Sequence, residues 1–496
     1  MTTTTTDSVR AGRMSKRDRN VIATLLVATF VVILNETIMS VALPTLMIDL
    51  QIDANTAQWL STAFMLTMAV VIPTTGFLLQ RLSTRTVYVL ALGLFCTGTA
   101  LAALAPGFWV LLLARVIQAC GTATMLPLLM TTILTLVPVE RRGVVMGNIG
   151  LVISVAPALG PTVSGLILQY FSWRFMFVAV LPIALATLVY GAARLVNVSE
   201  PGEQRLDVWS VILTVPAFGG IVFGLSNLTN PNGFAVGIAS LVVGVLCLVL
   251  FGLRQRALAR SDNSPLLDLR AFDFKMFKLA VTVLCIAMVA LFGSVILLPI
   301  YLQTIRGLTS LQTGLLVLPG GVVMGVLGPI VGRLLDRFGP PVLAASGGVV
   351  LVLALLGLST ASATTPVWLL LIMHVAVMTS LAFLFTPAFT SGLNPLPPHL
   401  YSHGSAIMTT LQQVSGAAGT AALVMIMGTR AATLIAAGES QTEALNGGIS
   451  LAFMVAAGIA VVAAVCAAFL RNPTPAHDRQ PDQDVVAQAD SELGAV

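Results

Sequence analysis

The sequence predicts an all-α integral membrane protein with fourteen transmembrane helices, organised as two six-helix halves plus two inserted helices. Hydrophobic residues make up 57% of the 496 residues and charged residues only 9%, whereas a soluble domain carries about 25% charged residues. The mean hydropathy of the chain is +0.96. So apolar a chain would not stay monomeric in water, which places it in a lipid bilayer. A nine-residue segment that recurs after the second and the tenth span indicates the two halves.

The predicted spans are apolar runs of about 20 residues, the length that crosses a bilayer as a helix. Fourteen such runs occur, at residues 21–43, 56–80, 86–105, 108–136, 143–170, 173–195, 207–227, 234–253, 277–302, 308–335, 341–360, 366–392, 403–433 and 448–470. The first run is too long for a signal peptide, and no small-residue cleavage site follows it. The expected organisation is a disordered tail at 1–20, a first half at 21–195, two inserted linker helices at 207–253, a second half at 277–470 and a disordered tail at 471–496.

The basic residues predict the orientation of the chain, because loops rich in Lys and Arg stay on the cytoplasmic side of a membrane. With the N-terminus inside, most basic loop residues fall on the cytoplasmic side, and only Arg174, Arg306 and Arg430 fall outside. Both termini are therefore expected in the cytoplasm. The formal net charge of +5 is interpreted as this orientation signal, and no nucleic-acid partner is expected.

Two segments of nine residues point to an internal repeat. PTTGFLLQR at 73–81 and PIVGRLLDR at 329–337 share Pro, Gly, Leu, Leu and Arg at the same five places. Each segment ends a span that runs from outside to inside and enters a short cytoplasmic loop. Parallel six-helix halves related in this way are typical of transporters.

The second copy of the segment carries the residues of a possible loop latch. Gly332 permits close approach of another helix and Gly339 permits a turn. Asp336 suits the positive N-terminal end of a neighbouring helix, while Arg333 and Arg337 suit acidic groups or lipid phosphates. The loop either latches one arrangement of the two halves or is an ordinary solvated loop, since many surface charges contribute little.

Several motifs together resemble the major facilitator superfamily, in its fourteen-helix drug:proton antiporter branch. GRLLDRFGP resembles the superfamily's loop motif, LLLARVIQACGTA its fourth-helix motif, GLVISVAPALGPTVSG its fifth-helix antiporter motif, and NETIMSVALP and WRFMF two signatures of the branch. GLNPLPPHLYSHGSAIMTTLQQ and LVLPGGVVMG are most similar to lincomycin-resistance exporters of Gram-positive bacteria. In the first-half loop the chain departs from the pattern, with Gln80 in place of an acid and Ser83 in place of a glycine. A charged latch is therefore expected only in the second half.

The resemblance covers all fourteen spans and implies a multi-pass protein of the bacterial cytoplasmic membrane. It implies that the partners are a small amphipathic substrate and protons. We expect a monomer that uses no cofactor and no metal.

Glu36 is the one acidic residue placed in the interior of a predicted span. A charge there costs roughly 2.5–3.5 kcal/mol on insertion scales. Loss of water disfavours the carboxylate, so Glu36 is expected to gain and lose a proton near physiological pH, as a proton carrier must. Arg115 is the only other charged residue in a span interior, and both lie roughly 10 Å below the outer boundary at 1.5 Å per residue.

Two opposite charges at one depth should pair or share a water-filled cavity. Gln118, one helical turn from Arg115, can join them. The resemblance implies that Glu36 and Arg115 take part in proton coupling. The alternative is a static pair that only fixes helix packing.

The fifth-helix motif contains Ser154, Pro157, Gly160, Pro161 and Gly165. Proline kinks a helix and glycine allows close packing, so a bent and tightly packed helix is expected. The resemblance implies that the bend shapes the cavity and limits proton leak. Polar or aromatic residues inside the spans are candidates for the substrate cavity, with helix packing as the alternative for each: Asn35, Phe64, Met65, Gln118, Tyr301, Gln303, His374, Gln412 and Gln413.

Other classes of protein are disfavoured by missing motifs. The spans hold no HExxH, GxSxG or CxxC, which argues against an enzyme or a metal site. No GxxxxGK[ST] occurs, which argues against a primary pump. The expected function is proton-coupled export of amphipathic drugs or antibiotics by alternating access, with Glu36 as the proton carrier. The alternative is a proton-coupled transporter of a specific metabolite, lipid or peptide on the same fold, and a receptor would not need two repeated halves.

Overall fold

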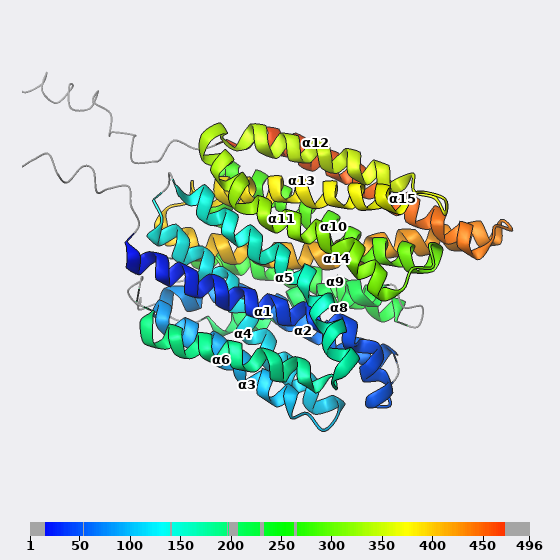
Figure 1. The fold of residues 1–496 in the computed structure, drawn as a ribbon. Coiled ribbons are helices and arrows are strands. Elements are labelled where there is room, and N and C mark those ends of the chain that lie inside the picture. The colour runs from blue at the N-terminus through cyan, green and yellow to red at the C-terminus, as the bar shows by residue number, and fades with distance from the viewer. Residues whose placement is uncertain are drawn as a thin grey trace, which may run out of the picture.

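The computed structural model describes residues 15–52, 54–138, 141–195, 197, 207–228, 233–261 and 265–471. Within these ranges the chain is helical and holds no strand (Figure 1). The α-helices are α1 (Lys16–Asp49), α2 (Ala54–Arg81), α3 (Thr84–Ala103), α4 (Phe108–Leu136), α5 (Arg142–Tyr170), α6 (Arg174–Arg194), α7 (Val208–Thr214), α8 (Gly220–Asn227), α9 (Phe234–Arg260), α10 (Lys275–Ile300), α11 (Ser310–Phe338), α12 (Pro340–Ser359), α13 (Val367–Leu393), α14 (Tyr401–Ala436) and α15 (Gln441–Ala468). Short π or 3-10 segments are η2 (Val215–Gly219), η3 (Leu269–Asp273), η4 (Tyr301–Ile305) and η5 (Pro398–Leu400).

The described residues contain thirteen stretches long and apolar enough to cross a membrane. One of them, Val208–Leu225, joins α7, η2 and most of α8 into a single span. The remaining predicted span corresponds to α5, a helix of 29 residues in which several side chains lie outside the described part. The predicted all-α membrane fold is therefore confirmed.

Among the helix starts, the largest differences from the predicted spans are at α1 and α15, which begin five and seven residues earlier because polar residues cap them. α1 begins at Lys16, inside the predicted tail, where the Ser15 hydroxyl accepts a hydrogen bond from the Asp18 backbone N–H at 3.0 Å. α15 begins at Gln441, where Ser440 accepts from the Glu443 N–H at 3.3 Å. Such caps start a helix with polar turns that hydropathy does not detect. The rest of the predicted tails, residues 1–14 and 472–496, lies outside the described residues.

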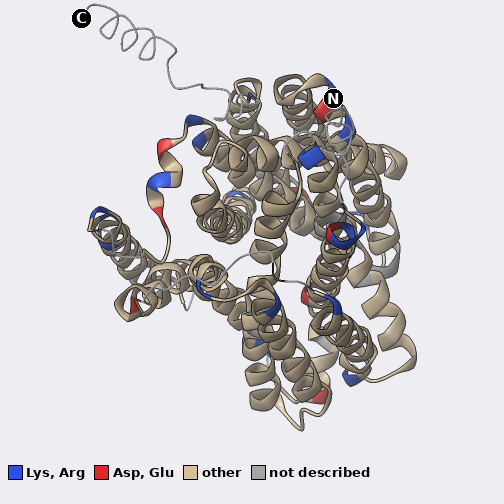
Figure 2. Ribbon diagram, turned by 90° about the vertical axis from the view of Figure 1, so that its left-hand side faces the viewer, with Lys and Arg blue, Asp and Glu red and all other residues tan. Residues whose placement is uncertain are grey.

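The helices lie side by side along one direction (Figure 1). In a first set, α1 to α6, α3 packs on α4 and α6, and α1 packs on α5 and α6. In a second set, α10 to α15, α12 packs on α13 and α15, and α10 packs on α13 and α14. The two sets meet where α5 packs on α11 and α2 on α14. α1 begins and α15 ends at the same end of the bundle, hereafter the terminal end, which Figure 2 views with Lys and Arg in blue.

The contact between α5 and α11 depends on glycine. A Cβ atom built at Gly147 would overlap the Gly328 carbonyl group, and one at Gly332 would overlap the Gly143 carbonyl oxygen. Only residues without a side chain let two helix backbones approach so closely. The two sets are thus in backbone contact near the terminal end.

The inserted helices pack beside α2 and α14. Asp207, the N-cap of α7, accepts two hydrogen bonds from Arg254 of α9, at 2.6 and 2.7 Å. Gln255 is buried, donates to the Ser210 hydroxyl at 2.6 Å and accepts from the Leu267 N–H at 3.2 Å. These bonds hold α7 to α9 and to the segment that leads into α10.

Candidate functional site

Arg115 on α4 lies inside the first helix set, with only 1% of its surface exposed. Its Nε donates to the Leu60 carbonyl of α2 at 3.4 Å, and its Nη1 donates to the Gln118 Oε1 at 3.1 Å. The guanidinium carbon lies 4.0 Å from the centroid of the Phe64 ring. A buried cation is costly unless neighbouring groups satisfy it. α2 and α4 therefore hold the guanidinium in one place by two hydrogen bonds and one ring.

Gln118 extends this network to α3. Its Nε2 donates to the Thr99 hydroxyl at 2.9 Å, and that hydroxyl donates to the Phe95 carbonyl at 2.7 Å. α3 comes so close because Gly98 and Gly121 face the opposite helix, where a Cβ atom would overlap backbone. Sequence reasoning missed Thr99. The only signal for Thr99 in the sequence is that it follows Gly98, a small residue that allows the third span to approach the fourth closely.

Glu36 lies on α1, half-buried, within electrostatic reach of Arg115. Within the described part of the chain the two side chains form no direct ion pair. The neighbouring Asn35 is buried, and its Nδ2 has no hydrogen-bond partner among the described residues. α1 is fixed on α5 at the next residue, because Thr37 occupies the space that a Cβ atom at Gly160 would need. The arrangement is a partly exposed carboxyl opposite a cation that other groups hold.

The other cavity candidates are divided between several places. Gln413 of α14 reaches across to the Met68 sulfur of α2 at 3.7 Å, and Gln412 is buried with an unpartnered Nε2 among the described residues. Met65 and Gln303 have exposed side chains.

Two further candidates lie within the second helix set. The Tyr301 hydroxyl donates to the Ser362 carbonyl at 2.6 Å, which ties the π turn η4 to the segment after α12. His374 of α13 is buried, with its Nδ1 3.3 Å from the Ser294 hydroxyl of α10 and its ring against Gly320 of α11. His374 thus bridges three helices.

Of the fifth-helix motif, Gly160 packs against Thr37, whereas nothing lies near a Cβ atom built at Gly165. The backbone of α5 is helical throughout the motif. The side chains of Ser154, Pro157 and Pro161 lie outside the described residues.

At the terminal end, the Asp336 carboxylate accepts hydrogen bonds from the backbone N–H groups of Gly143 and Val144, in the first turn of α5. A helix N-terminus favours a negative group in this position. Gly339 ends α11 with a φ of 78°, in the left-handed region where glycine is favoured. Of the basic residues in this segment, Arg333 is exposed and Arg337 lies over the ring of Phe338, at 5.2 Å.

Arg142, at the start of α5, makes a second tie between the sets. Its side chain is 6% exposed. It donates to the Asn394 Oδ1 at 3.0 Å and to the Tyr401 hydroxyl at 3.3 Å. Arg142 lies just before the predicted span 143–170 and so looks like a basic loop residue in the sequence. A single sequence does not reveal which of two adjacent arginines turns inward.

The first copy of the repeated segment also reaches across the bundle. Gln80, which stands where the superfamily pattern has an acid, donates from its Nε2 to the His399 carbonyl in η5 at 2.9 Å. Thr131 of α4 and Ser405 of α14 share a hydrogen bond of 3.0 Å. Together with Asp336 and Arg142, these residues close the terminal end of the bundle.

At the opposite end, polar contacts join helices of the first set. The Trp173 indole N–H donates to Asp49 at the end of α1 at 2.9 Å. Arg174 donates to the Ala105 carbonyl at 2.9 and 3.2 Å and lies 3.9 Å from Asp49. The WRFMF segment therefore anchors α1 and the α3–α4 turn to the start of α6.

Comparison with known proteins identifies relatives that match most of the chain. A sequence profile of the Major Facilitator Superfamily matches residues 25–420. Two proteins of Bacillus subtilis (strain 168) are each 40% identical to this chain: the MFS-type transporter YcnB, over 93% of this chain and 97% of its own length, and the lincomycin resistance protein LmrB, over 91% and 95%. The human organic anion transporter MFSD10 (TETRAN) has a similar structure, with a TM-score of 0.66 at 14% identity, covering 91% of this chain and 100% of that one. This likeness in structure confirms the predicted fold class.

Proposed function

Because the chain belongs to the Major Facilitator Superfamily, a family of transporters, we propose that it exports amphipathic drugs or antibiotics from the cytoplasm in exchange for protons. The similarity to the lincomycin resistance protein LmrB supports a drug as the substrate. The distribution of basic residues supports an orientation with both termini inside, and we expect the chain to act as a multi-pass monomer of the bacterial cytoplasmic membrane. The terminal end is then the cytoplasmic end, and the conformation described above is closed toward the cytoplasm.

The proposal rests on the relation between Glu36 and Arg115. Among the described spans, Glu36 is the acidic residue that lies away from a helix end. Ionisable groups inside a membrane are rare and mark proton relays and ion pathways. Because Leu60, Gln118 and Phe64 already hold Arg115, the Glu36 carboxyl is free to take up a proton without releasing the arginine from its place.

Protonation is expected to drive the cycle through this pair. A proton arriving from outside neutralises Glu36 and removes its attraction to Arg115, which favours release of the substrate and return to the inward-open state. Substrate that binds from the cytoplasm favours release of the proton. Opposite charges attract strongly where little water screens them, so one proton changes the balance between the two states.

The deciding experiment is transport in proteoliposomes, with the pH gradient and the voltage varied separately. Ethidium serves as the first substrate, followed by a panel that includes lincomycin. Glu36→Gln should fold and bind substrate but lose export driven by the pH gradient. Glu443→Gln, which removes an exposed carboxyl at the start of α15, should transport as the unchanged chain does.

Full export by Glu36→Gln under a pH gradient would rule out Glu36 as the proton carrier. Export of no member of the panel, with proton movement upon addition of one metabolite, would favour the transporter of a specific metabolite instead.

A further inference from the structure

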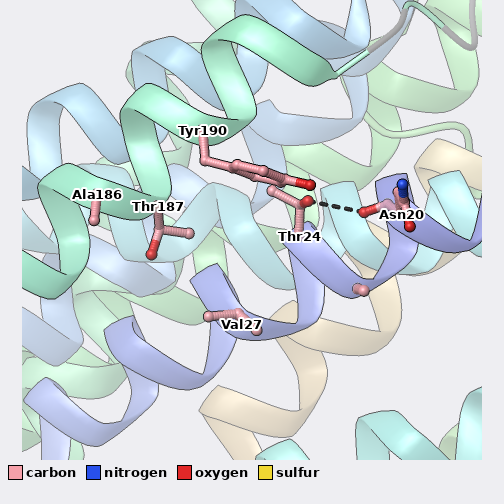
Figure 3. Close-up of a pocket in the computed structure, with 7 residues that line it drawn as sticks. Asn20, Thr24, Val27, Ala186, Thr187 and Tyr190 are labelled. Atoms are coloured by element: carbon pink, nitrogen blue, oxygen red, sulfur yellow. Dashed lines mark hydrogen bonds between the residues drawn. The ribbon is translucent and has the colours of Figure 1, made fainter. Parts of the chain in front are cut away.

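A groove of about 360 Å³ opens on the outer surface of the bundle between α1 and α6 (Figure 3). Asn20, Thr24 and Val27 line it from α1, and Ala186, Thr187 and Tyr190 line it from α6. On α1 these residues are spaced by four and three positions, and on α6 Tyr190 follows Ala186 by four and Thr187 by three, so each set lies on one face of its helix. The groove begins one turn from the start of α1 and runs away from the terminal end.

The wall that α6 provides is fixed from behind by α3. Tyr88 of α3 is fully buried, and its hydroxyl donates to the Thr187 carbonyl at 2.7 Å. Its ring fills the space beside Gly191, where a Cβ atom would overlap it. With its backbone held at these two points, α6 presents Ala186 and Tyr190 to the groove in a constant position.

The lining is apolar at one end and polar at the other. Val27 and Ala186 give an alkyl surface to the part of the groove farther from the terminal end, while Asn20 and the Tyr190 hydroxyl lie nearer that end. Figure 3 shows the Tyr190 ring projecting from α6 toward α1, on the side of Thr24 and Asn20. The Thr24 hydroxyl donates to the Asn20 carbonyl at 2.8 Å. Its hydrogen is therefore engaged in a bond within α1 and is not available to a ligand in the groove.

Basic side chains continue both walls beyond the polar end. Lys16 and Arg17 precede Asn20 by four and three residues, and Arg194 follows Tyr190 by four residues, which places all three within about one helical turn. All three are exposed. The first turn of α1 and the last turn of α6, which carry these basic residues, contain one acidic residue, Asp18.

The surroundings of the groove select the kind of ligand. Val27, Ile183 and Val189 beside it are 51%, 54% and 67% exposed, which in a membrane protein means contact with acyl chains. Tyrosine with its ring in an apolar setting and its hydroxyl toward water is typical of the membrane interface. Lys and Arg just beyond that level attract anionic lipid headgroups. A zwitterionic headgroup would bring its own positive charge among the three basic residues.

We propose that this groove is a binding site for one anionic phospholipid of the leaflet at the terminal end. One acyl chain lies along Val27 and Ala186, the glycerol region meets Asn20 and Tyr190, and the phosphate lies among Lys16, Arg17 and Arg194. The bound lipid joins α1, the helix that carries Glu36, to α6. The site requires only that the chain spans a membrane and does not depend on the proposed substrate.

The test is native mass spectrometry of the full chain in detergent, titrated with phosphatidylglycerol or phosphatidylcholine. The unchanged chain should retain one phosphatidylglycerol at least about tenfold more tightly than phosphatidylcholine. The double variant Arg17→Gln/Arg194→Gln should lose about 10- to 30-fold in affinity for phosphatidylglycerol, since each basic residue near a membrane surface contributes roughly fivefold. Ala186→Phe keeps every charge but fills the groove, and it should abolish the same binding event.

Controls separate this site from general attraction of charge. Arg256→Gln/Arg260→Gln removes two exposed charges from the last turns of α9, at the same end of the bundle, and should leave the affinity unchanged. Inorganic phosphate should not displace the lipid. Equal losses in the two double variants, full binding by Ala186→Phe, or displacement by phosphate alone would each overturn the proposal. Melting curves without lipid show whether each variant is folded, and Ala186→Leu is the milder filling variant.

Discussion

Glu36 on α1 and Arg115 on α4 attract each other without forming a direct ion pair in the described part of the structure. The guanidinium of Arg115 is held by the Leu60 carbonyl, Gln118 and the Phe64 ring, and none of these contacts involves the Glu36 carboxyl. The separation matters for transport, because a direct buried ion pair would resist protonation and fix the helices. The contacts that hold Arg115 can therefore be tested by substitution just as Glu36 can.

Arg115→Lys should reduce export at least about tenfold although the positive charge remains. A lysine ammonium is a point charge that lacks the planar face and the fixed donors of a guanidinium, so it would not serve the Leu60 carbonyl, Gln118 and the Phe64 ring together. Rates of ethidium export in proteoliposomes measure the loss. Arg430→Lys, at an exposed site of α14, is the matched control and should keep the full rate. Normal export by Arg115→Lys would show that charge alone suffices.

Asp336→Ala should open the terminal end more often. The carboxylate accepts from two N–H groups of α5, and bonds of this kind contribute about 1–2 kcal/mol, which corresponds to an increase of about 5- to 30-fold in the open population. The measurement is the rate at which maleimide modifies a cysteine introduced at Thr131, which faces Ser405, in a chain without its five native cysteines. Arg333→Ala, an exposed change in the same segment, should leave the rate unchanged. A rate that Asp336→Ala does not alter would remove the latch from the mechanism.

The stability of the inserted helices should depend on pH through Asp207. The Arg254 guanidinium that donates to Asp207 lowers the pKa of this carboxyl from 3.8 to about 2, against the opposing effect of burial and with help from the Ser210 hydroxyl. A carboxyl whose pKa is lower in the folded state stabilises that state above pH 3.8, and this contribution disappears as the pH falls toward 2. Asp207→Asn should therefore lower the free energy of unfolding by about 1–2 kcal/mol at neutral pH.

The difference between Asp207→Asn and the unchanged chain should stay constant above about pH 5 and shrink below pH 4. Denaturant unfolding in detergent across this range measures it. Glu439→Gln, at an exposed turn before α15, should show no such difference at any pH. A constant difference down to the lowest pH would mean that packing, rather than the charge, is responsible.

Two glycines of the fifth-helix motif should respond differently to the same change. Gly160→Ala would place a methyl group onto Thr37 of α1, whereas Gly165→Ala would meet no atom within 4 Å. Overpacking typically costs about 1–3 kcal/mol, so Gly160→Ala should lower the melting temperature and slow export. Gly165→Ala should change neither. Equal effects of the two variants would argue that the motif acts through its helix backbone and not through contact with α1.

Much of the fold could be predicted from the sequence because a bilayer imposes one simple condition, a long apolar helix. Hydropathy therefore located the spans, while the polar caps at Ser15 and Ser440 set helix ends that it could not detect. The charge of Glu36 and Arg115 stood out for the same reason. The groups that hold Arg115 and Gln118 did not stand out, since Thr99 and the Leu60 carbonyl resemble any other group of an apolar helix.

The contacts across the bundle were the least predictable part. They depend on how each helix is rotated, and one sequence does not specify that rotation. Arg142 looked like a loop charge but lies buried against Asn394 and Tyr401. Because Gln80 replaces an acid, the first-half loop was expected to make no charged contact across the bundle. Gln80 nevertheless donates to the His399 carbonyl from the place in the first repeat that Asp336 has in the second.

The two copies of the repeated segment thus reach across the bundle with different chemistry. Asp336 uses a carboxylate, whose attraction to the start of α5 weakens as dissolved ions screen it. Gln80 uses a neutral amide, which ionic strength barely affects. Opening of the terminal end should therefore start where α5 meets α11, while the junction of α2 with η5 acts as the pivot, so that the molecule parts asymmetrically rather than along its whole width at once.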